Sequence, residues 1–295
     1  MSTQRPPTID PQAAQRWAGR SPGPSPWLHE EVARRMEERL TWIKFKPQNW
    51  AHWQPVTGGL HSHDVLARRY PQAACVVSEP IQSHCDYASA LLTKPWWNPA
   101  RWTGQPIRFQ PPAAASVEML WANMALHMAS DPQELIGQWH RALATGGFLM
   151  FSCLGPDTLA RLREHYRGLG WPAPSHEFTD MHDWGDMLVA AGFAEPVMDM
   201  ERITLTFQSP ERLLEELRGL GRNLHLNRFT SLRGRQWLRQ LMVTLAEEPL
   251  ELEFEVIYGH AFKPVPRLAV RPETVLSLEQ MKDSLRAAKT RQLGL

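Results

Sequence analysis

Short apolar runs alternate with helix-like stretches through the middle of this chain. Residues 73–77, 117–121 and 148–152 are continuous runs of mostly apolar residues, a pattern typical of strands that are buried on both faces. A helical stretch is expected at 64–70, before the first run, and another at 133–143, between the last two. Parallel strands that are joined by helices form a sheet covered on both sides. The sequence therefore predicts an α/β fold with a doubly wound, mostly parallel sheet.

The same alternation continues toward the C-terminus. The further expected elements, in chain order, are helices at 156–169 and 180–191, a strand at 196–206, helices at 210–219 and 230–247, and a strand at 252–258. The last two helices fall between two strands, so we expect a helical insertion at about 209–248 within one domain that spans 27–265. Residues 266–295 are expected to form a C-terminal tail with a short helix.

Prolines separate the N-terminal segment from this domain. Residues 1–26 contain six prolines, too many for a long regular element. The first confident helix is expected to begin at Ser25-Pro26, where a capping residue precedes a proline. We therefore treat residues 1–26 as a proline-rich segment of its own.

Charge and cysteine usage exclude several classes of function. Lys and Arg number 32 and Asp and Glu 31, so the formal net charge of +1 gives no broad basic surface for nucleic acid. No apolar run approaches the ~20 residues that span a membrane, and no secretory signal is visible. The three cysteines, Cys75, Cys85 and Cys153, have no metal-ligand spacing and favour a reducing compartment. We expect a cytoplasmic protein without a metal site; the sequence leaves the oligomeric state open.

Several stretches resemble a known family. Residues 121–128 look like the end of the fourth strand in class I S-adenosylmethionine-dependent methyltransferases, and Gly146-Gly147 with the strand that follows matches the fifth. Residues 154–159 and 255–264 are similar to the malonyl-acyl-carrier-protein O-methyltransferases of biotin synthesis, the BioC type. The resemblance covers about residues 25–264. It implies a Rossmann-like, seven-stranded sheet with inserted C-terminal helices, and S-adenosylmethionine as the cofactor.

The resemblance also implies a glycine-rich turn that binds this cofactor after the first strand, which would be residues 49–53. The three glycine positions of the turn fall on Val56, Gly58 and Leu60, and Gly59 adjoins the one glycine that remains. Glycine is needed where the backbone touches a ligand, because a side chain would occupy the ligand's space. Gly58 and Gly59 are thus candidate cofactor contacts. The degraded motif predicts that cofactor binding is weakened or abolished unless the loop follows a different path.

Other cofactor contacts implied by the resemblance are kept in part. Glu79 follows the strand at 73–77, where the family's acidic residue accepts hydrogen bonds from both ribose hydroxyls. The loop at 109–116, which would lie beside the adenine, contains no acidic residue. Asn123 is a further candidate contact at the end of its strand, although it could simply cap a turn. In the family's N-terminal lid, a phenylalanine–aspartate start and a tyrosine correspond here to Ile9-Asp10 and, approximately, Trp17.

Methyl transfer to a malonyl carboxylate makes few demands on catalytic side chains. The nucleophile is already ionised at neutral pH, so the enzyme must align the reactants and exclude water. Asn123, Tyr258 and His260 are candidates to line such an active site, and the alternative for Tyr258 and His260 is that they end a strand. No catalytic role is assigned to any one residue at this stage.

Arginines near the Gly219-Leu220-Gly221 turn are candidates to bind a partner. Arg218 and Arg222 flank this turn and Arg228 follows it. An acyl carrier protein is acidic, so its docking surface should be basic. We therefore expect these arginines to bind an acyl carrier protein or a small acyl substrate; the alternative is a solvated helix face.

Two main hypotheses on function remain. The first is an S-adenosylmethionine-dependent methyltransferase of the BioC type, favoured by the C-terminal half of the sequence. The second is a catalytically inactive protein of the same fold that binds a partner, favoured by the altered turn at 56–60 and the acid-free loop at 111–116. A more remote third hypothesis is an assembly factor for a larger complex.

Overall fold

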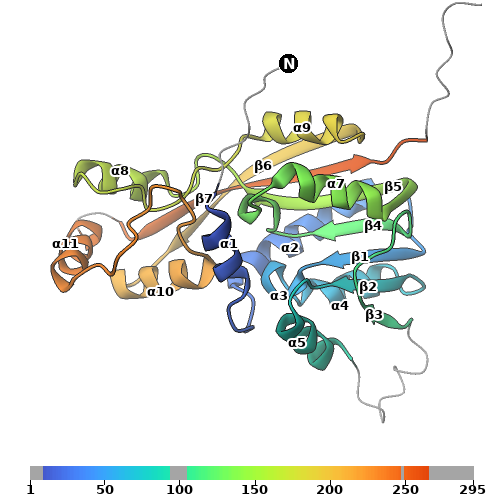
Figure 1. Cartoon of the computed structure of the whole chain (residues 1–295), viewed down its shortest axis with the longest axis horizontal. Helices are drawn as coiled ribbons and strands as arrows, with labels where there is room; N and C mark the ends of the chain where they lie inside the picture. Colours follow the sequence, from blue (N-terminus) through green and yellow to red (C-terminus); the bar gives the residue numbers. More distant parts are fainter. Residues whose placement is uncertain (1–8, 94–104, 247–248, 266–295) are drawn as a thin grey trace, which may run out of the picture. The chain divides into compact units, whose positions relative to one another are not determined.

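A seven-stranded sheet organises this chain. The computed structural model describes residues 9–93, 105–246 and 249–265. The strands are β1 (Asn49–Trp53), β2 (Ala74–Ser78), β3 (Ile107–Phe109), β4 (Val117–Ala122), β5 (Leu143–Leu154), β6 (Ala194–Thr206) and β7 (Glu251–Phe262). Their order in the sheet is β3-β2-β1-β4-β5-β7-β6 (Figure 1). Strands β1 to β5 are parallel, and β7 is antiparallel to both of its neighbours, β5 and β6. The predicted α/β, doubly wound, mostly parallel sheet is confirmed.

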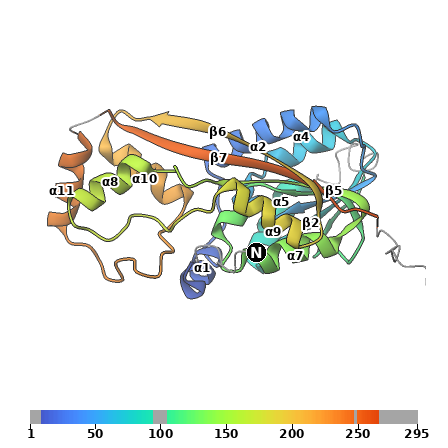
Figure 2. The same ribbon diagram turned by 90° about the horizontal axis from the view of Figure 1, so that it is seen from above.

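Helices cover both faces of the sheet. The helices in the described part of the chain are α1 (Pro11–Ala18), α2 (Trp27–Arg39), α3 (Pro55–Gly58), α4 (Ser62–Arg69), α5 (Gln82–Leu92), α7 (Pro132–Ala142), α8 (Ala160–Gly168), α9 (Met181–Ala190), α10 (Pro210–Leu220) and α11 (Arg235–Ala246), with short 3₁₀ turns η1 (Leu40–Trp42) and η2 (Leu126–Met128). In Figure 2, α2 and α4 lie on one side of the sheet and α7 and α9 on the other. The two helices expected within 209–248 are α10 and α11, which lie between β6 and β7 in the sequence.

Alternate residues of each central strand belong to different cores. Trp50 of β1 and Met119 of β4 pack with the core that includes α2 and α4. Their neighbours Ala51 and Leu120 pack with the core that includes α7 and α9. Successive side chains of a strand point to opposite faces, so a strand with helices on both sides is buried along its whole length. This explains why the parallel strands were recognisable as short apolar runs.

The first strand is buried despite its polar composition. β1 lies between β2 and β4, and His52 on it is only 1% exposed. The His52 ring stacks on the ring of His63 from α4, with centroids 5.8 Å apart. Burial lowers the pKa of His52 well below its ordinary value, which keeps the imidazole neutral in the core. A neutral aromatic ring packs there as an apolar side chain would.

The described part of the N-terminal segment, residues 9–26, contains one short helix. Helix α1 begins at Pro11, and the Asp10 side chain accepts hydrogen bonds from the backbone N–H groups of Gln12 and Ala13. A capping carboxylate followed by proline favours a helix start, which explains how eight residues form a helix in a proline-rich segment. None of the helices in the described part of the chain has the length and apolar character that a bilayer crossing needs. The tail expected at 266–295 lies outside the described residues.

Candidate active site

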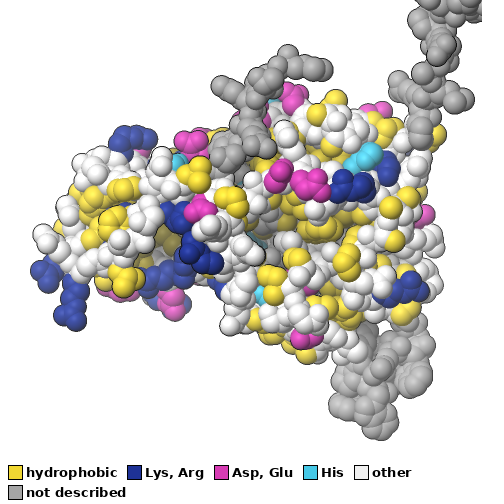
Figure 3. Space-filling view, in the orientation of Figure 1, with side chains coloured by type: hydrophobic (Ala, Val, Ile, Leu, Met, Phe, Trp, Pro, Cys, Tyr) yellow, Lys and Arg dark blue, Asp and Glu magenta, His cyan; other side chains and the backbone are white. Residues whose placement is uncertain are grey.

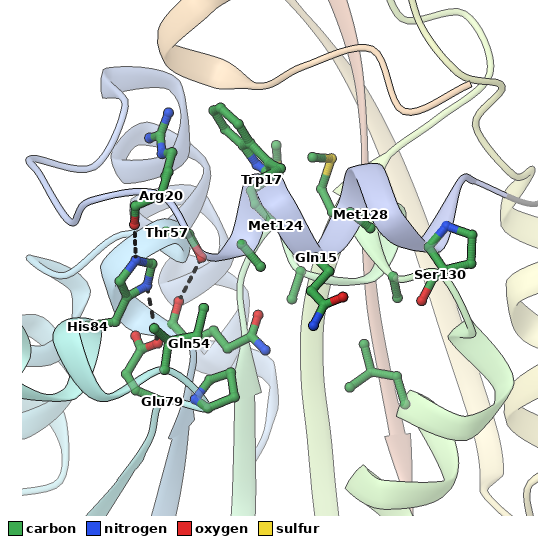
Figure 4. A pocket seen from close by; sticks show the side chains of 18 of the residues that line it. Gln15, Trp17, Arg20, Gln54, Thr57, Glu79, His84, Met124, Met128 and Ser130 are labelled. Carbon is green, nitrogen blue, oxygen red and sulfur yellow. Dashed lines mark hydrogen bonds and ion pairs between the residues drawn. The ribbon is translucent and has the colours of Figure 1, made fainter. Parts of the chain in front are cut away.

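A cavity of about 420 Å³ lies at the carboxyl ends of β1, β2 and β4, and we call it the sheet-end cavity (Figure 4). Ligands of open α/β sheets bind at this edge, and the volume falls in the range of small-molecule sites. Helix α1 contributes one wall, and the loops that follow the three strands contribute the opposite wall. Its polar and large side chains include Gln15, Trp17, Arg20, Gln54, Thr57, Glu79, His84, Met124 and Met128.

The loop after β1 buries two of its apolar side chains, Val56 and Leu60, away from this cavity. Gln54 has a φ of 49°, in the left-handed region, and the single turn of α3 follows it. Val56 and Leu60 are 3% and 8% exposed and belong to the hydrophobic core. Neither is among the residues that line the sheet-end cavity. The side chains of Val56 and Leu60 therefore lie in the core and leave this cavity open, and weakened cofactor binding stays a prediction.

Gly58, Gly59 and Asn123 form a buried contact behind the cavity wall. The Asn123 Nδ2 group donates hydrogen bonds to the Gly58 carbonyl and, at 2.8 Å, to the His29 carbonyl, while Ser152 Oγ donates to Asn123 Oδ1 at 2.6 Å. A Cβ atom on Gly58 would lie 2.5 Å from the Asn123 carbonyl oxygen, and Gly59 has a φ of +116°. None of the three lines the cavity. In the structure these residues hold the loops after β1 and β4 together, and their direct contact with a cofactor stays a prediction.

Glu79 is the predicted site residue that reaches the cavity. It directly follows β2, and its side chain is 1% exposed. Its Oε1 atom accepts a hydrogen bond from the Val56 backbone N–H at 2.8 Å, and its Oε2 atom lies 3.8 Å from Nδ1 of His84. Burial raises the pKa of Glu79 to about 7, because water is excluded from the charged form. The carboxyl group therefore ionises near neutral pH, and its Oε1 atom is hydrogen-bonded to the backbone of the loop after β1.

Contacts with the segment between α10 and α11 hold helix α1 against the sheet-end cavity. Asp10 and Arg228 form an ion pair at 2.6 Å, and the Asp10 backbone N–H donates to the Leu224 carbonyl at 2.8 Å. The Arg20 guanidinium stacks on the Trp17 ring at 3.9 Å. The Arg228 side chain is 17% exposed and helps to hold the N-terminal helix in place, and its role in partner binding stays a prediction.

A second cavity, of about 370 Å³, adjoins the first, and we call it the apolar cavity. It lies among η2, α8, α10 and α11, and it shares Met128 and Leu220 with the sheet-end cavity. Most of its lining is aliphatic or aromatic, but Arg218 and Arg222, two of the predicted partner residues, also line it. The helical insertion thus builds a hydrophobic compartment with positive charge beside the sheet-end cavity.

Tyr258 and His260 lie away from these cavities. Tyr258, inside β7, donates a hydrogen bond to Glu201, and the Arg39 guanidinium lies 3.7 Å from its ring centre. Burial and the neighbouring Glu201 raise the pKa of Tyr258. The His260 ring packs edge-on against Phe262. Neither residue lines the sheet-end or the apolar cavity, and their catalytic role stays a prediction. The alternative that they end the strand is wrong, because β7 continues to Phe262.

Several cavity residues escaped the sequence analysis. His84 of α5 and Arg20 were not singled out, and they meet in the structure, where His84 Nε2 donates to the Arg20 carbonyl at 2.9 Å. The one feature of the sequence that could have indicated His84 as a site residue is its position, shortly after Glu79 and the end of β2. In the described part of the chain, no group of three His, Cys, Asp or Glu side chains converges on a metal site.

Comparison with known proteins identifies the family. No family model matches the chain. The malonyl-[acyl-carrier protein] O-methyltransferase of Gallionella capsiferriformans is 38% identical over 252 residues, which cover 82% of this chain and 86% of that protein. The chain belongs to the malonyl-acyl-carrier-protein O-methyltransferase family. Proteins with the same name from Methylovorus sp. and Laribacter hongkongensis are 35% and 32% identical, over 82% and 81% of this chain and 84% of each of those proteins.

Solved structures agree with this family membership at the level of the fold. The YcgJ protein of Bacillus subtilis superimposes with a TM-score of 0.53 at 15% identity, and covers 80% of this chain and 99% of that chain. A candidate methyltransferase from Bacillus halodurans C-125 has a TM-score of 0.53 at 16% identity, and the match covers 78% of this chain and 99% of that chain. The malonyl-acyl-carrier-protein O-methyltransferase family member described here thus has the predicted class I, Rossmann-like methyltransferase fold.

Proposed function

We propose that this protein transfers a methyl group from S-adenosylmethionine to the free carboxyl group of a malonyl thioester carried by an acyl carrier protein. The observation that carries the proposal is the buried carboxyl group of Glu79 at the carboxyl end of β2, in a cavity of ligand size. The relatives compared above share one enzyme name. That shared name favours the enzyme over the catalytically inactive alternative.

The residues of the sheet-end cavity fit the cofactor. A carboxylate such as that of Glu79 can accept hydrogen bonds from both hydroxyls of a ribose. Trp17, Met124 and Met128 offer apolar surface for the remaining parts of the molecule, and Gln54 and Thr57 offer polar groups. Val56 and Leu60 do not obstruct it, because their side chains are buried in the core. The altered glycine motif is thus compatible with binding.

Bound S-adenosylmethionine would supply an electrophilic methyl group on a sulfonium sulfur. A malonyl carboxylate is ionised at neutral pH, so no side chain has to remove a proton. The tasks left to the protein are to align the carboxylate with the methyl group and to exclude water. Helix α1 covers the sheet-end cavity, and the apolar cavity beside it provides a place for the acyl chain. Arg218 and Arg222 add positive charge for an anionic substrate.

The test is methyl transfer from labelled S-adenosylmethionine to malonyl-acyl carrier protein. The product ester releases labelled methanol in alkali, and acetyl-acyl carrier protein, which has no free carboxylate, should accept no label. Calorimetric titration with S-adenosylhomocysteine accompanies the assay, with Glu79→Ala as the variant that should lose binding. Ligand binding without transfer to malonyl-acyl carrier protein would overturn the substrate assignment. A well-folded protein that binds neither cofactor form at millimolar concentration would support the inactive alternative.

A further inference from the structure

A third cavity, of about 600 Å³, is lined by an unusual concentration of guanidinium groups, and we call it the arginine cavity. Five arginines line it: Arg16, Arg20, Arg222, Arg228 and Arg233. Figure 3 shows basic side chains gathered left of centre, between the region of α1 and that of α10 and α11. Within the described residues, Arg228 alone among the five pairs with a carboxylate, that of Asp10. Several like charges are thus held together without matching counter-charges, which favours an anionic ligand.

The positive charges influence one another. Burial and the nearby Arg222 lower the pKa of Arg20, which lines both the sheet-end and the arginine cavities. Arg222 donates hydrogen bonds to the carbonyls of Arg218 and Gly221, at 2.6 and 3.0 Å, which orient its guanidinium group. An oriented guanidinium group binds phosphate more strongly than a freely moving one, because less conformational freedom is lost. The chemistry of the arginine cavity is that of a phosphate site.

The apolar cavity holds a second sign of a ligand. Ser175 Oγ, His127 Nδ1 and His176 Nδ1 have no hydrogen-bond partner among the described residues, and all three side chains line this cavity. Each residue is more than nine-tenths buried. Each of these atoms is covered by its neighbours, so a ligand in the cavity could reach it only after the side chain turns. Because an unpaired buried polar group costs about 1–3 kcal/mol, a ligand that supplied the missing partner would recover that cost.

The protonation state of His176 defines what this ligand must offer. His176 Nε2 donates to the His127 carbonyl at 3.0 Å, because a carbonyl can only accept. Burial lowers the pKa of His176 to about 4, so the ring is neutral and its Nδ1 atom is an acceptor. The best partner for such an atom is an N–H group, and an amide that also presents a carbonyl would suit the Ser175 hydroxyl.

The three cavities form a series. The sheet-end and apolar cavities share Met128 and Leu220, and the apolar and arginine cavities share Tyr166, Pro174, Arg222, Asn223 and Trp237. A ligand that extends from the first to the third would need a reactive end, a chain with amide groups and then a phosphate. The phosphopantetheine arm of an acyl carrier protein has this order of groups.

We propose that the phosphopantetheine arm of the carrier protein lies in the apolar cavity, with its amide groups at Ser175 and His176 and its phosphate among Arg16, Arg20 and Arg222. This inference rests on the proposed function, since it specifies how the acyl substrate is held. The arm brings the malonyl group toward the sheet-end cavity, and its phosphate fixes how far it enters.

The experiment compares two methyl acceptors that differ only by the phosphate, malonyl-pantetheine and malonyl-phosphopantetheine. One well-placed phosphate should raise kcat/KM about 10- to 100-fold in the wild-type protein. Arg222→Met should reduce this ratio to within about threefold of one. Arg212→Met is the matched control: Arg212 lies on α10, pairs with Glu215 and lines none of the three cavities, so the ratio should stay at the wild-type value.

Two outcomes would overturn the inference. Equal kcat/KM for the two acceptors in the wild-type protein would mean that the arginine cavity takes no phosphate. A preference for malonyl-phosphopantetheine that stays at the wild-type value in Arg222→Met would place the phosphate outside the arginine cavity. Failure of the proposed function gives a different result, namely no methyl transfer to any thioester. In that case calorimetry, which needs no methyl transfer, compares the affinities of phosphopantetheine and pantetheine. An affinity for phosphopantetheine that is about 10- to 100-fold higher would support the inference, and equal affinities would overturn it.

Discussion

Replacing Glu79 by glutamine should stabilise the ligand-free protein at alkaline pH. The amide oxygen of glutamine can still accept the hydrogen bond that the Val56 N–H donates at 2.8 Å, whereas the buried negative charge is removed. Burial raises the pKa of this carboxyl from 4.5 to about 7, so the folded state binds its proton more tightly than the unfolded state. The wild-type protein therefore loses stability as the pH rises from about 4.5 to 7. Integrated over that window, the loss is about 3 kcal/mol.

The measurement is urea unfolding of wild type and Glu79→Gln at pH 5.0 and 8.5. The free energy of unfolding of Glu79→Gln should exceed that of wild type by about 3 kcal/mol at pH 8.5 and by little at pH 5.0. Glu164→Gln, a change at an exposed carboxyl of α8, is the control and should show no such pH-dependent difference. A difference between Glu79→Gln and wild type that does not grow with pH would refute the argument, because it would mean that Glu79 does not ionise near neutrality.

The same substitution should have the opposite effect on ligand binding. A carboxylate that accepts two ribose hydroxyls makes charge-assisted hydrogen bonds, which glutamine replaces only in part. Affinity for S-adenosylhomocysteine should fall about 10- to 100-fold in Glu79→Gln at pH 8.5. In wild type, affinity should decrease as the pH falls below about 7, since the carboxyl then becomes protonated. Calorimetry that finds the same affinity in both proteins would remove Glu79 from the binding site.

Two further substitutions test the loops and the helix around the site. Gly58→Ala should lower the free energy of unfolding by about 1–3 kcal/mol, because its Cβ would lie 2.5 Å from the Asn123 carbonyl oxygen. Gly219→Ala, on α10 with open space around it, is the control in the same urea experiment and should not destabilise the protein. Asp10→Ala removes the cap of α1 and the ion pair with Arg228. Limited proteolysis within residues 9–20 should therefore become faster, and bound S-adenosylhomocysteine should protect this segment less than in wild type. Unchanged proteolysis would show that Asp10 does not hold α1 in place.

The sheet was predictable from the sequence because most of its strands are buried on both faces. Such strands appear as short apolar runs, and Glu79 could be placed at the end of one of them. The first strand lacked this signal, since it contains a histidine that becomes apolar only when burial keeps it neutral. It was located through the family resemblance instead.

The directions of side chains in loops and late strands were not predictable in the same way. The family resemblance placed Val56 and Leu60 at positions that contact the cofactor, but in the structure both side chains lie in the core. Tyr258 was close to the expected strand end, yet the register of β7 against β6 directs it to Glu201. Arg228 forms an ion pair with Asp10, which is far from it in the sequence, and no local sequence pattern indicates such a long-range contact.

Helix α1 contributes residues to both the sheet-end cavity and the arginine cavity. It forms a wall of the sheet-end cavity, and it also carries Arg16, which with the adjoining Arg20 lines the arginine cavity. Any displacement of this helix that opens the first cavity withdraws guanidinium groups from the third. Under the proposed function, exchange of spent cofactor and release of the carrier arm would therefore be coupled through one eight-residue helix.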